Sequence, residues 1–246
     1  MSLHDQYRMD FIRELTAMSA RHNIVTVFGD AVGMMAAALV MATARDMAAA
    51  DREYKAIAER YTKEEMAHMP KMLVAVIDAL ELRRESFLGP ILEEVGAANQ
   101  HNGQFLTPAS VATMMAEVNM GDYEHTPGNV VKIEDPACGA GVTLIAQAEM
   151  LVQKKHIPQR DIFLIGGDID KRAVDMTFVE LTLLGYAARV DHMNALSMQV
   201  LSPARYTLGY YLHGMQWRAA ARKIFMGHCS ARNYLIEKGS RLFKLG

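Results

Sequence analysis

The sequence predicts an α/β protein in which a helical amino-terminal region precedes a short, mainly parallel sheet. Residues 1–98 carry almost no strand signals, whereas residues 130–167 hold two apolar, strand-like runs with a helical pattern between them. Strand, helix and strand in that order form the unit from which parallel sheets are built. At 246 residues the chain is long enough for one large domain or two small ones.

The first hundred residues show apolar side chains at helical spacing. Asp30 is expected to cap the second helix, Thr62 and Glu65 form a capping box, and Pro70 either starts or kinks a helix. A polar connector over residues 97–103 marks a boundary, so residues 1–98 are expected to form a helical domain. The expected helices cover Asp5–Arg21, Asp30–Met47, Arg52–Tyr61, Thr62–Met69, Lys71–Leu82 and Ile91–Val95.

Composition narrows the class of protein. The two cysteines, Cys138 and Cys229, cannot make a disulfide framework, which indicates a reducing cytoplasm. The polar start of the chain does not resemble a signal peptide, and the apolar run Ala31–Ala44 is too short to span a bilayer. The nine histidines are isolated, so no metal site is expected. The 19 methionines fill core gaps or, alternatively, form an adaptable binding surface.

The stretch from Val130 to Val152 carries the strongest local signal. An apolar strand leads into a turn with Gly139 and Gly141, and a helical pattern begins at Val142. Glycines let the backbone approach a ligand closely, and a helix amino terminus offers N–H groups to an anion. A dinucleotide fingerprint would place a third glycine at Leu144, so the pattern disfavours NAD or FAD and leaves other nucleoside ligands open.

A second buried strand is expected over Asp161–Gly167, and it ends at Asp168. A carboxylate at this point of a nucleotide-binding unit accepts hydrogen bonds from ribose hydroxyls; alternatively, Asp168 is a simple turn residue. Asp170 is expected to cap the helix Arg172–Leu184, and a third strand is expected around Ala188–His192.

Two blocks resemble those of a known family. The segment Asp135–Gly141, with sequence Asp-Pro-Ala-Cys-Gly-Ala-Gly, resembles the S-adenosylmethionine loop of the DNA adenine N6-methyltransferases. Gly103–Pro108 resembles the Gly-Gln-aromatic-aromatic-Thr-Pro segment that precedes this loop in the family. The likeness covers residues 100–197 and is closest to the modification subunits of type I restriction systems and their phage- and plasmid-borne relatives. It implies a bacterial protein with a Rossmann-like, S-adenosylmethionine-dependent core over residues 99–202.

The resemblance implies which residues hold this cofactor. Thr107 and nearby N–H groups would bind the methionine carboxylate, although Thr107 is equally a good N-cap for a helix that starts at Pro108 and runs to Val118. Ile169 would lie against the adenine, and Asn194 would meet the adenine edge. The implied cofactor site comprises Gln104, Phe105, Thr107, Pro108, Asp135, Pro136, Ala137, Cys138, Gly139, Gly141, Asp168, Ile169, Asn194 and Ala195.

The family's catalytic motif is not found, so the catalytic residues stay unknown. Adenine N6 enzymes carry Asn- or Asp-Pro-Pro-aromatic, which orients the amine of a flipped base. This chain has no Asn-Pro or Pro-Pro pair, and its nearest stretch is Ser202–Tyr206. Too few residues follow for a complete sheet, so we expect a truncated sheet whose open edge is covered by the amino-terminal helices or a second subunit.

The last 44 residues, 203–246, differ in charge from the rest. They carry eight basic side chains and one acidic one, Glu237, so this segment is +7 on a body of −9. Aromatic residues alternate with the cations, as in segments that bind nucleic acid; alternatively, a helix packs its aromatics on the sheet with its cations in water. The expected nucleic-acid contacts are Arg205, Arg218, Arg222 and Lys223.

Three functions follow as expectations. The first is an adenine N6 DNA methyltransferase that acts on DNA alone or with a partner that supplies the missing motif. The second is a catalytically inactive protein that binds S-adenosylmethionine, such as a regulator or anti-restriction factor. The third is a nucleic-acid-binding module in which the fold is a relic.

Overall fold

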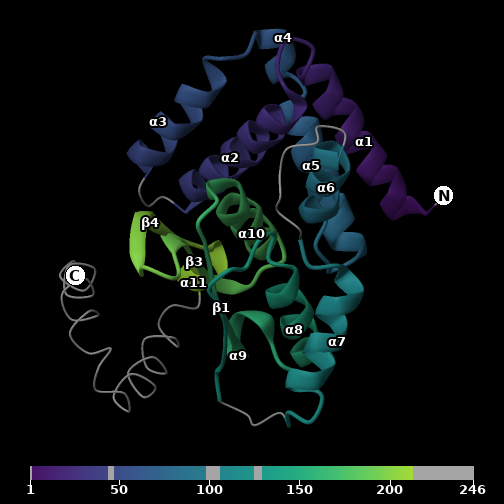
Figure 1. Ribbon diagram of the computed structural model, residues 1–246, viewed down its shortest axis with the longest axis vertical. Coiled ribbons are helices and arrows are strands. Elements are labelled where there is room, and N and C mark those ends of the chain that lie inside the picture. Colours follow the sequence, from purple (N-terminus) through teal and green to yellow (C-terminus); the bar gives the residue numbers. More distant parts are fainter. Residues whose placement is uncertain (1, 44–46, 98–105, 125–128, 213–246) are drawn as a thin grey trace.

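The computed structural model describes residues 2–43, 47–97, 106–124 and 129–212. These residues form a mixed α/β structure with one four-stranded sheet, and helices fill the upper and right-hand parts of the view in Figure 1. The expected α/β class is thereby confirmed.

The sheet has its strands in chain order. Strands β1 (Val131–Asp135), β2 (Ile162–Asp168) and β3 (Ala187–Asn194) are parallel neighbours, and β4 (Gln199–Tyr206) runs antiparallel to β3. Leu164 at the centre of β2 is opposite Ile133 on one side and Ala188 on the other. The carboxyl ends of β1, β2 and β3 therefore lie at one edge, where ligands of parallel sheets bind.

Both crossover helices cover the same face of the sheet. Helix α8 (Val142–Gln153) joins β1 to the short α9 (Pro158–Asp161), and α10 (Lys171–Leu183) joins β2 to β3. A side chain at Gly166 would meet Leu144 of α8 and Thr177 of α10 at 3.2 and 3.4 Å, which places both helices over this point. Glycine at 166 therefore lets α8 and α10 pack closely on β2.

In the described part of the chain, six helices precede the sheet and a seventh leads into it. Their bounds are α1 Leu3–Met18, α2 Ile24–Ala42, α3 Met47–Ala58, α4 Lys63–Met66, α5 Met69–Leu82, α6 Leu88–Ala97 and α7 Ala109–Met120.

The expected caps of these helices are partly confirmed. Thr62 and Glu65 form the expected capping box at α4, and Pro70 lies in the first turn of α5. The second helix, however, is capped by Asn23, whose Oδ1 accepts hydrogen bonds from Val25 and Thr26. Asp30 instead lies inside α2, so its expected role as a cap is wrong. Its carboxylate pairs with Arg60 and accepts a hydrogen bond from Tyr61.

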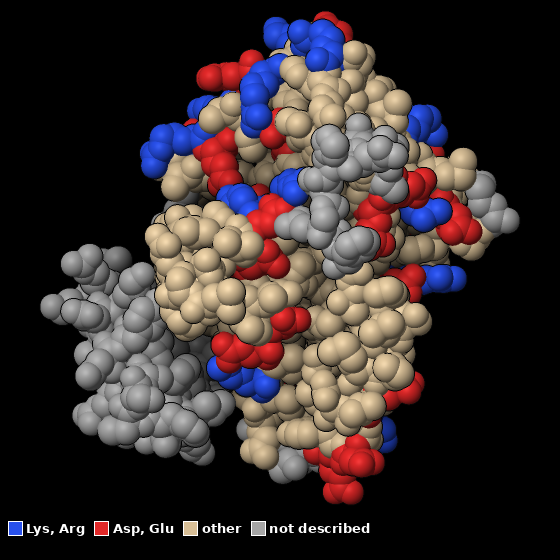
Figure 2. Space-filling model, in the orientation of Figure 1, with Lys and Arg blue, Asp and Glu red and all other residues tan. Residues whose placement is uncertain are grey.

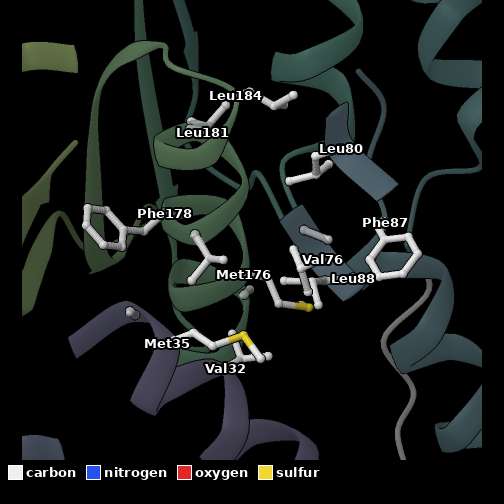
Figure 3. Close-up of a cluster of buried hydrophobic side chains, with 14 of the residues drawn as sticks. Val32, Met35, Val76, Leu80, Phe87, Leu88, Met176, Phe178, Leu181 and Leu184 are labelled. Atoms are coloured by element: carbon white, nitrogen blue, oxygen red, sulfur yellow. The ribbon is translucent and has the colours of Figure 1, made fainter. Parts of the chain in front are cut away.

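One hydrophobic core joins the amino-terminal helices to the sheet layer. Figure 3 shows Val32 and Met35 of α2 and Val76 of α5 beside Met176 of α10, in a cluster that continues to Phe178. Many methionines are buried here, so they fill the core as expected. The division of the chain at residue 98 thus remains a prediction about domains that share one core.

Helix α2 is the most apolar helix of this layer. By length and composition alone it could cross a membrane, and half of its most apolar window is buried inside the protein. It packs against α10, α3, α1 and α6, which is the expected behaviour of a core helix.

Two features differ from, or extend, the expected sheet. The stretch Gln199–Tyr206, expected to begin a mainly helical tail, forms β4, and only the short α11 (Leu208–Leu212) follows within the described residues. The amino-terminal helices pack mainly on α10, whereas the principal neighbours of β1 are β2 and α8. Those helices therefore lie over α10, and cover of the β1 edge by a second subunit stays a prediction.

Candidate functional site

The turn after β1 is held by backbone hydrogen bonds. The Cys138 N–H donates to the Gly167 carbonyl at 2.9 Å, and the Gly141 N–H donates to the Cys138 carbonyl at 2.8 Å. Gly139 has φ +53° and Gly141 has φ +79°, a left-handed backbone that favours glycine. The chain needs both glycines to turn from β1 into α8, as the sequence pattern indicated.

Asp135 holds the start of this turn. Its Oδ1 accepts a hydrogen bond from the Ala137 N–H at 3.1 Å, and its Oδ2 accepts one from the Thr143 hydroxyl. Pro136 and Ala137 are exposed. Asp135 therefore ties the end of β1 to the first turn of α8 and presents residues 136–137 to solvent.

Asp168 joins the ends of the first two strands. Its Oδ2 accepts a hydrogen bond from the Gly139 N–H at 2.9 Å, and its Oδ1 accepts one from the Asp170 N–H at 2.8 Å. A carboxylate has about four lone-pair sites, so capacity for further donors remains on both oxygens. The next residue, Ile169, is 58% exposed and offers an apolar surface beside this carboxylate.

The two sequence blocks meet at one small cavity of about 60 Å³. It lies between the segment before α7 and the turn after β1. Its lining residues are Leu106, Thr107, Asp135, Ala137, Cys138, Gly139, Ala140, Val142 and Thr143. Segments about thirty residues apart in the sequence are therefore adjacent in space. Gln104 and Phe105 lie outside the described residues.

Thr107 does not cap α7. The N-cap is Pro108, with ψ 143°, and its carbonyl accepts hydrogen bonds from Val111 and Ala112 at 3.0 Å. The helix starts one residue later than expected because Pro108 is itself extended. The expectation of a Thr107 cap is wrong, and the structure places the half-buried Thr107 beside the cavity instead.

Cys138 is a structural residue of the turn. Its side chain is buried, and its Sγ lies 3.7 Å from the Thr177 hydroxyl. Burial raises the pKa of the Cys138 thiol to about 12, with the carboxylates of Asp168 and Asp135 adding to the shift. A thiol with so high a pKa is not a nucleophile at neutral pH.

Asn194 ends β3 and Ala195 follows it, at the same edge of the sheet. The Asn194 Oδ1 accepts hydrogen bonds from Leu196 N–H at 3.0 Å and Ser197 N–H at 3.1 Å. The amide oxygen thus closes a local turn, and the expected contact with an adenine amino group would have to compete with it.

His192 is a site residue that sequence reasoning missed. Its Nε2 lies 3.1 Å from the Ile169 carbonyl, and its Nδ1 lies 3.1 Å from the Ser202 hydroxyl. It therefore links the loop after β2 to β4. An isolated histidine in an apolar strand carries no signal that could have revealed this role.

Ser202 lies far from the turn after β1. It is opposite His192 on β4, the fourth strand in the order β1-β2-β3-β4. Neighbouring strands are spaced by roughly 4.8 Å, so Ser202–Tyr206 is three strand spacings away. The stretch nearest to a catalytic motif in sequence is therefore not beside the loop.

Arg205 has a structural role. Its guanidinium pairs with Glu53 of α3 at 2.8 Å and with Asp175 of α10 at 3.2 Å, and it lies 5.6 Å from the centre of the Phe178 ring. With its side chain only 11% exposed, Arg205 is not placed to contact nucleic acid, and we correct that expectation. Three other expected contacts, Arg218, Arg222 and Lys223, lie outside the described residues.

The surface shows charges of both signs. On the face in Figure 2, acidic and basic side chains of the described part are interspersed, without an extended basic stripe. Among the described residues, no group of three or more His, Cys, Asp or Glu side chains could hold a metal ion.

A larger cavity of about 390 Å³ lies between α2, α3 and the start of α10. Its charged lining residues are already paired: Asp30 with Arg60, Arg172 with Asp170, and both Glu53 and Asp175 with Lys171. We therefore assign these groups to packing of α10 against α2 and α3.

Comparison with known proteins identifies the segment that holds the loop. Residues 89–203 match the family model described as N-6 DNA Methylase. No curated protein and no solved structure matches the chain. The matched segment starts in α6 and ends within β4, and it includes Thr107, the turn after β1 and Asp168. The similarity to the N-6 DNA methylase family therefore covers the segment that holds the candidate site.

Proposed function

We propose that the protein binds S-adenosylmethionine on a Rossmann-like core, at the carboxyl edge of the parallel strands. The observation that carries this proposal is that Thr107, the turn after β1 and Asp168 belong to one connected site. Each of these was expected from the sequence to touch the same cofactor.

The chemistry of the site fits the proposed cofactor. The cavity of about 60 Å³ is smaller than the roughly 300–1,000 Å³ of a whole ligand pocket, so it suits only the methionine end. Thr107 and the backbone of the turn would bind that end. Asp168 would accept hydrogen bonds from the ribose hydroxyls, and Ile169 would lie against the adenine ring. When bound, the cofactor supplies an electrophilic methyl group.

We further propose that the methyl acceptor is adenine N6 in DNA. The family match supports a DNA methylase function. The match ends at residue 203, and the chain has no Asn-Pro-Pro-aromatic motif. Residues that hold a flipped base are needed for this chemistry, so we propose that a protein partner supplies them in a bacterial, phage- or plasmid-borne restriction-modification system. We place this activity in the cytoplasm, because Cys138 in the loop is a free thiol.

A second function is favoured by the antiparallel β4. The chain turns back at β3, and the stretch closest to a catalytic motif lies three strands from β1. The alternative is therefore a catalytically inactive S-adenosylmethionine-binding regulator or anti-restriction protein. Transfer of a labelled methyl group to DNA separates the two: incorporation, alone or with added modification and specificity subunits, supports the methyltransferase, whereas binding without incorporation in both settings supports the regulator.

Cofactor binding is tested by calorimetric titration of S-adenosylmethionine. Asp168→Ala should weaken binding by about 1–3 kcal/mol, the scale of hydrogen bonds to a charged group. Asp170→Asn is the matched control, because this residue caps α10 through its Oδ1 and an amide oxygen still accepts that bond. Equal affinities of the wild type and Asp168→Ala would contradict the assigned site, and no binding by the wild type would contradict the function.

A further inference from the structure

Glu180 is a buried carboxyl group that the proposed function does not use. Its side chain lies on α10 with no exposed surface. Its Oε1 accepts hydrogen bonds from the Phe87 N–H at 2.7 Å and the Leu88 N–H at 2.6 Å, at the start of α6. Within the described part of the chain, its Oε2 has no hydrogen-bond partner. Glu180 therefore satisfies N–H groups that a helix amino terminus otherwise leaves unpaired.

The start of α6 packs against the turn after β1, which is the candidate cofactor loop. A Cβ at Gly89 would lie 2.9 Å from the Ala140 Cβ and 3.4 Å from a methyl carbon of Leu106. A Cβ at Gly139 would lie 3.1 Å from Leu106. The amino end of α6 and Leu106 thus form one wall around the turn that lines the small cavity. Figure 3 shows Phe87 and Leu88 in the same buried cluster as Met176 and Leu181 of α10.

We propose that Glu180 is a positioning residue for the loop: its protonated carboxyl group clamps the amino end of α6 against Gly139 and Ala140, and loss of the proton loosens this clamp. The inference rests on the proposed function in one respect, because it assigns the loop to S-adenosylmethionine. The clamp itself is a property of the protein without ligand.

The direction of the pH effect follows from burial. Burial raises the pKa of Glu180 to about 7, against the opposing effect of the hydrogen bonds from the Leu88 and Phe87 N–H groups. In an open clamp, where water reaches the Glu180 carboxyl group, its pKa would be near the ordinary 4.5. Because the closed clamp retains the proton to higher pH than the open one, raising the pH through this window favours opening.

Other ionisable groups surround the clamp and must be separated from it. The ring of His4 in α1 lies edge-on to that of Phe87, with the ring centres 5.5 Å apart. The His4 Nε2 lies 3.7 Å from the Glu85 Oε1. Arg84, in the connector before α6, pairs with Glu149 of α8. His4→Asn should therefore keep the pH dependence of the clamp, whereas Glu180→Gln, which is neutral at all pH values, should remove it.

The first test does not involve the cofactor. Cys138 is buried beneath the turn, so its reaction with a maleimide reports opening of the loop in a full-length Cys229→Ser background. Glu180→Ala should react at least tenfold faster than the parent, because the buried N–H groups of Phe87 and Leu88 lose their acceptor, at about 1–3 kcal/mol each. Glu149→Gln is the matched control, because Glu149 bonds Arg84 but not α6; its rate should not change.

The pH dependence of the labelling rate distinguishes the clamp from a purely structural role of Glu180, which would leave that dependence unchanged. Between pH 6 and 8, the rate of the parent divided by that of Glu180→Gln at the same pH should rise roughly tenfold. Dividing the two rates removes the effect of thiol ionisation, which is the same in both proteins at a given pH. A flat ratio, or equal rates for Glu180→Ala and the parent, would overturn the clamp, and Glu180→Gln keeps the test valid if Glu180→Ala does not fold.

Calorimetry with S-adenosylmethionine then separates the clamp from the proposed function. Affinity depends on the fraction of closed loop and labelling on the ratio of open to closed loop, so the affinity of the parent should change less with pH than the labelling ratio and should not exceed that of Glu180→Gln. A rising ratio without cofactor binding would support the clamp and reject the proposed ligand. Cofactor binding together with a flat labelling ratio would reject the clamp and keep the ligand.

Discussion

Gly141 shows how one backbone conformation fixes the loop. Its φ of +79° lies in the left-handed region, and an added Cβ would lie 3.0 Å from the Thr177 hydroxyl. A non-glycine residue in that region costs roughly 1–2 kcal/mol. Gly141→Ala should therefore lower the free energy of unfolding by about 1–3 kcal/mol, measured by urea denaturation.

The matched control for this substitution is Gly96→Ala. Gly96 lies in α6, and nothing comes within 4 Å of an added Cβ. Alanine there should leave stability unchanged or raise it by up to about 1 kcal/mol. If both variants have the stability of the wild type, the left-handed turn does not limit the residue at position 141.

Glu180 also predicts how global stability depends on pH. Its pKa of about 7 in the folded protein exceeds the ordinary 4.5, so the folded state holds a proton that the unfolded state has released. The contribution of Glu180 is fully present below pH 4.5 and is lost as the pH rises through 7. Urea denaturation at pH 5 and pH 8 should show Glu180→Gln gaining stability relative to the wild type at the higher pH. An unchanged difference would show that the carboxyl group is not held protonated by burial.

Strand β4 depends on one arginine that reaches two helices. Arg205 joins β4 to Glu53 of α3 and to Asp175 of α10, whose carboxyl pKa is raised by burial. Removing one partner of a buried ion pair costs about 3–5 kcal/mol. Arg205→Ala should destabilise the protein on this scale in thermal unfolding.

An exposed pair provides the comparison for Arg205. Lys55 and Asp51 pair at 2.7 Å within α3, with side chains 66% and 45% exposed. Such pairs contribute at most about 0.5 kcal/mol, so Lys55→Ala should have little effect. If Arg205→Ala instead leaves stability intact and weakens binding to DNA, the structural role assigned to Arg205 fails.

The same elements show which parts of the fold local sequence reveals. The glycine turn, the strands around it and the cap at Asp170 follow from residues close in sequence, and all are present. Strand β4 does not follow, because it contains Pro203 and because register shifts interrupt its pairing with β3. Asn23 was missed as a cap for a different reason: both Asn23 and Asp30 have a suitable side chain, and Asp30 instead pairs with residues distant in sequence.

The candidate site divides in the same way. Thr107, the turn and Asp168 were found because each belongs to a short motif, and their proximity follows from the parallel order of β1 and β2. His192 and Glu180 were not found, because their roles come from segments distant in sequence: Ile169 and Ser202 for the histidine, and the start of α6 for the glutamate. Single buried polar residues carry no periodic signal that would distinguish them.

The molecule as a whole is organised around α10, which contacts both the sheet and the amino-terminal helices. Met176 on this helix is buried beside Val32, Met35 and Val76 (Figure 3). The continuous core predicts that the amino-terminal helices and the methylase segment unfold together, even though their boundary near residue 98 was expected to separate two domains. Cooperative units larger than one motif arise in this way when a core is shared.

Scanning calorimetry of the full chain tests this prediction with Met176→Ala. Loss of a buried methionine costs about 2–5 kcal/mol, and with one shared core the whole transition should shift to lower temperature without splitting. Met114→Ala on α7 is the control, because that side chain is 58% exposed and surface changes stay within about 0.5 kcal/mol. Two separate transitions, with only the one assigned to the methylase segment shifted, would show that α10 does not couple the halves. In that case the clamp at Glu180 would be a contact between independent domains, and its opening would no longer require any loss of the common core.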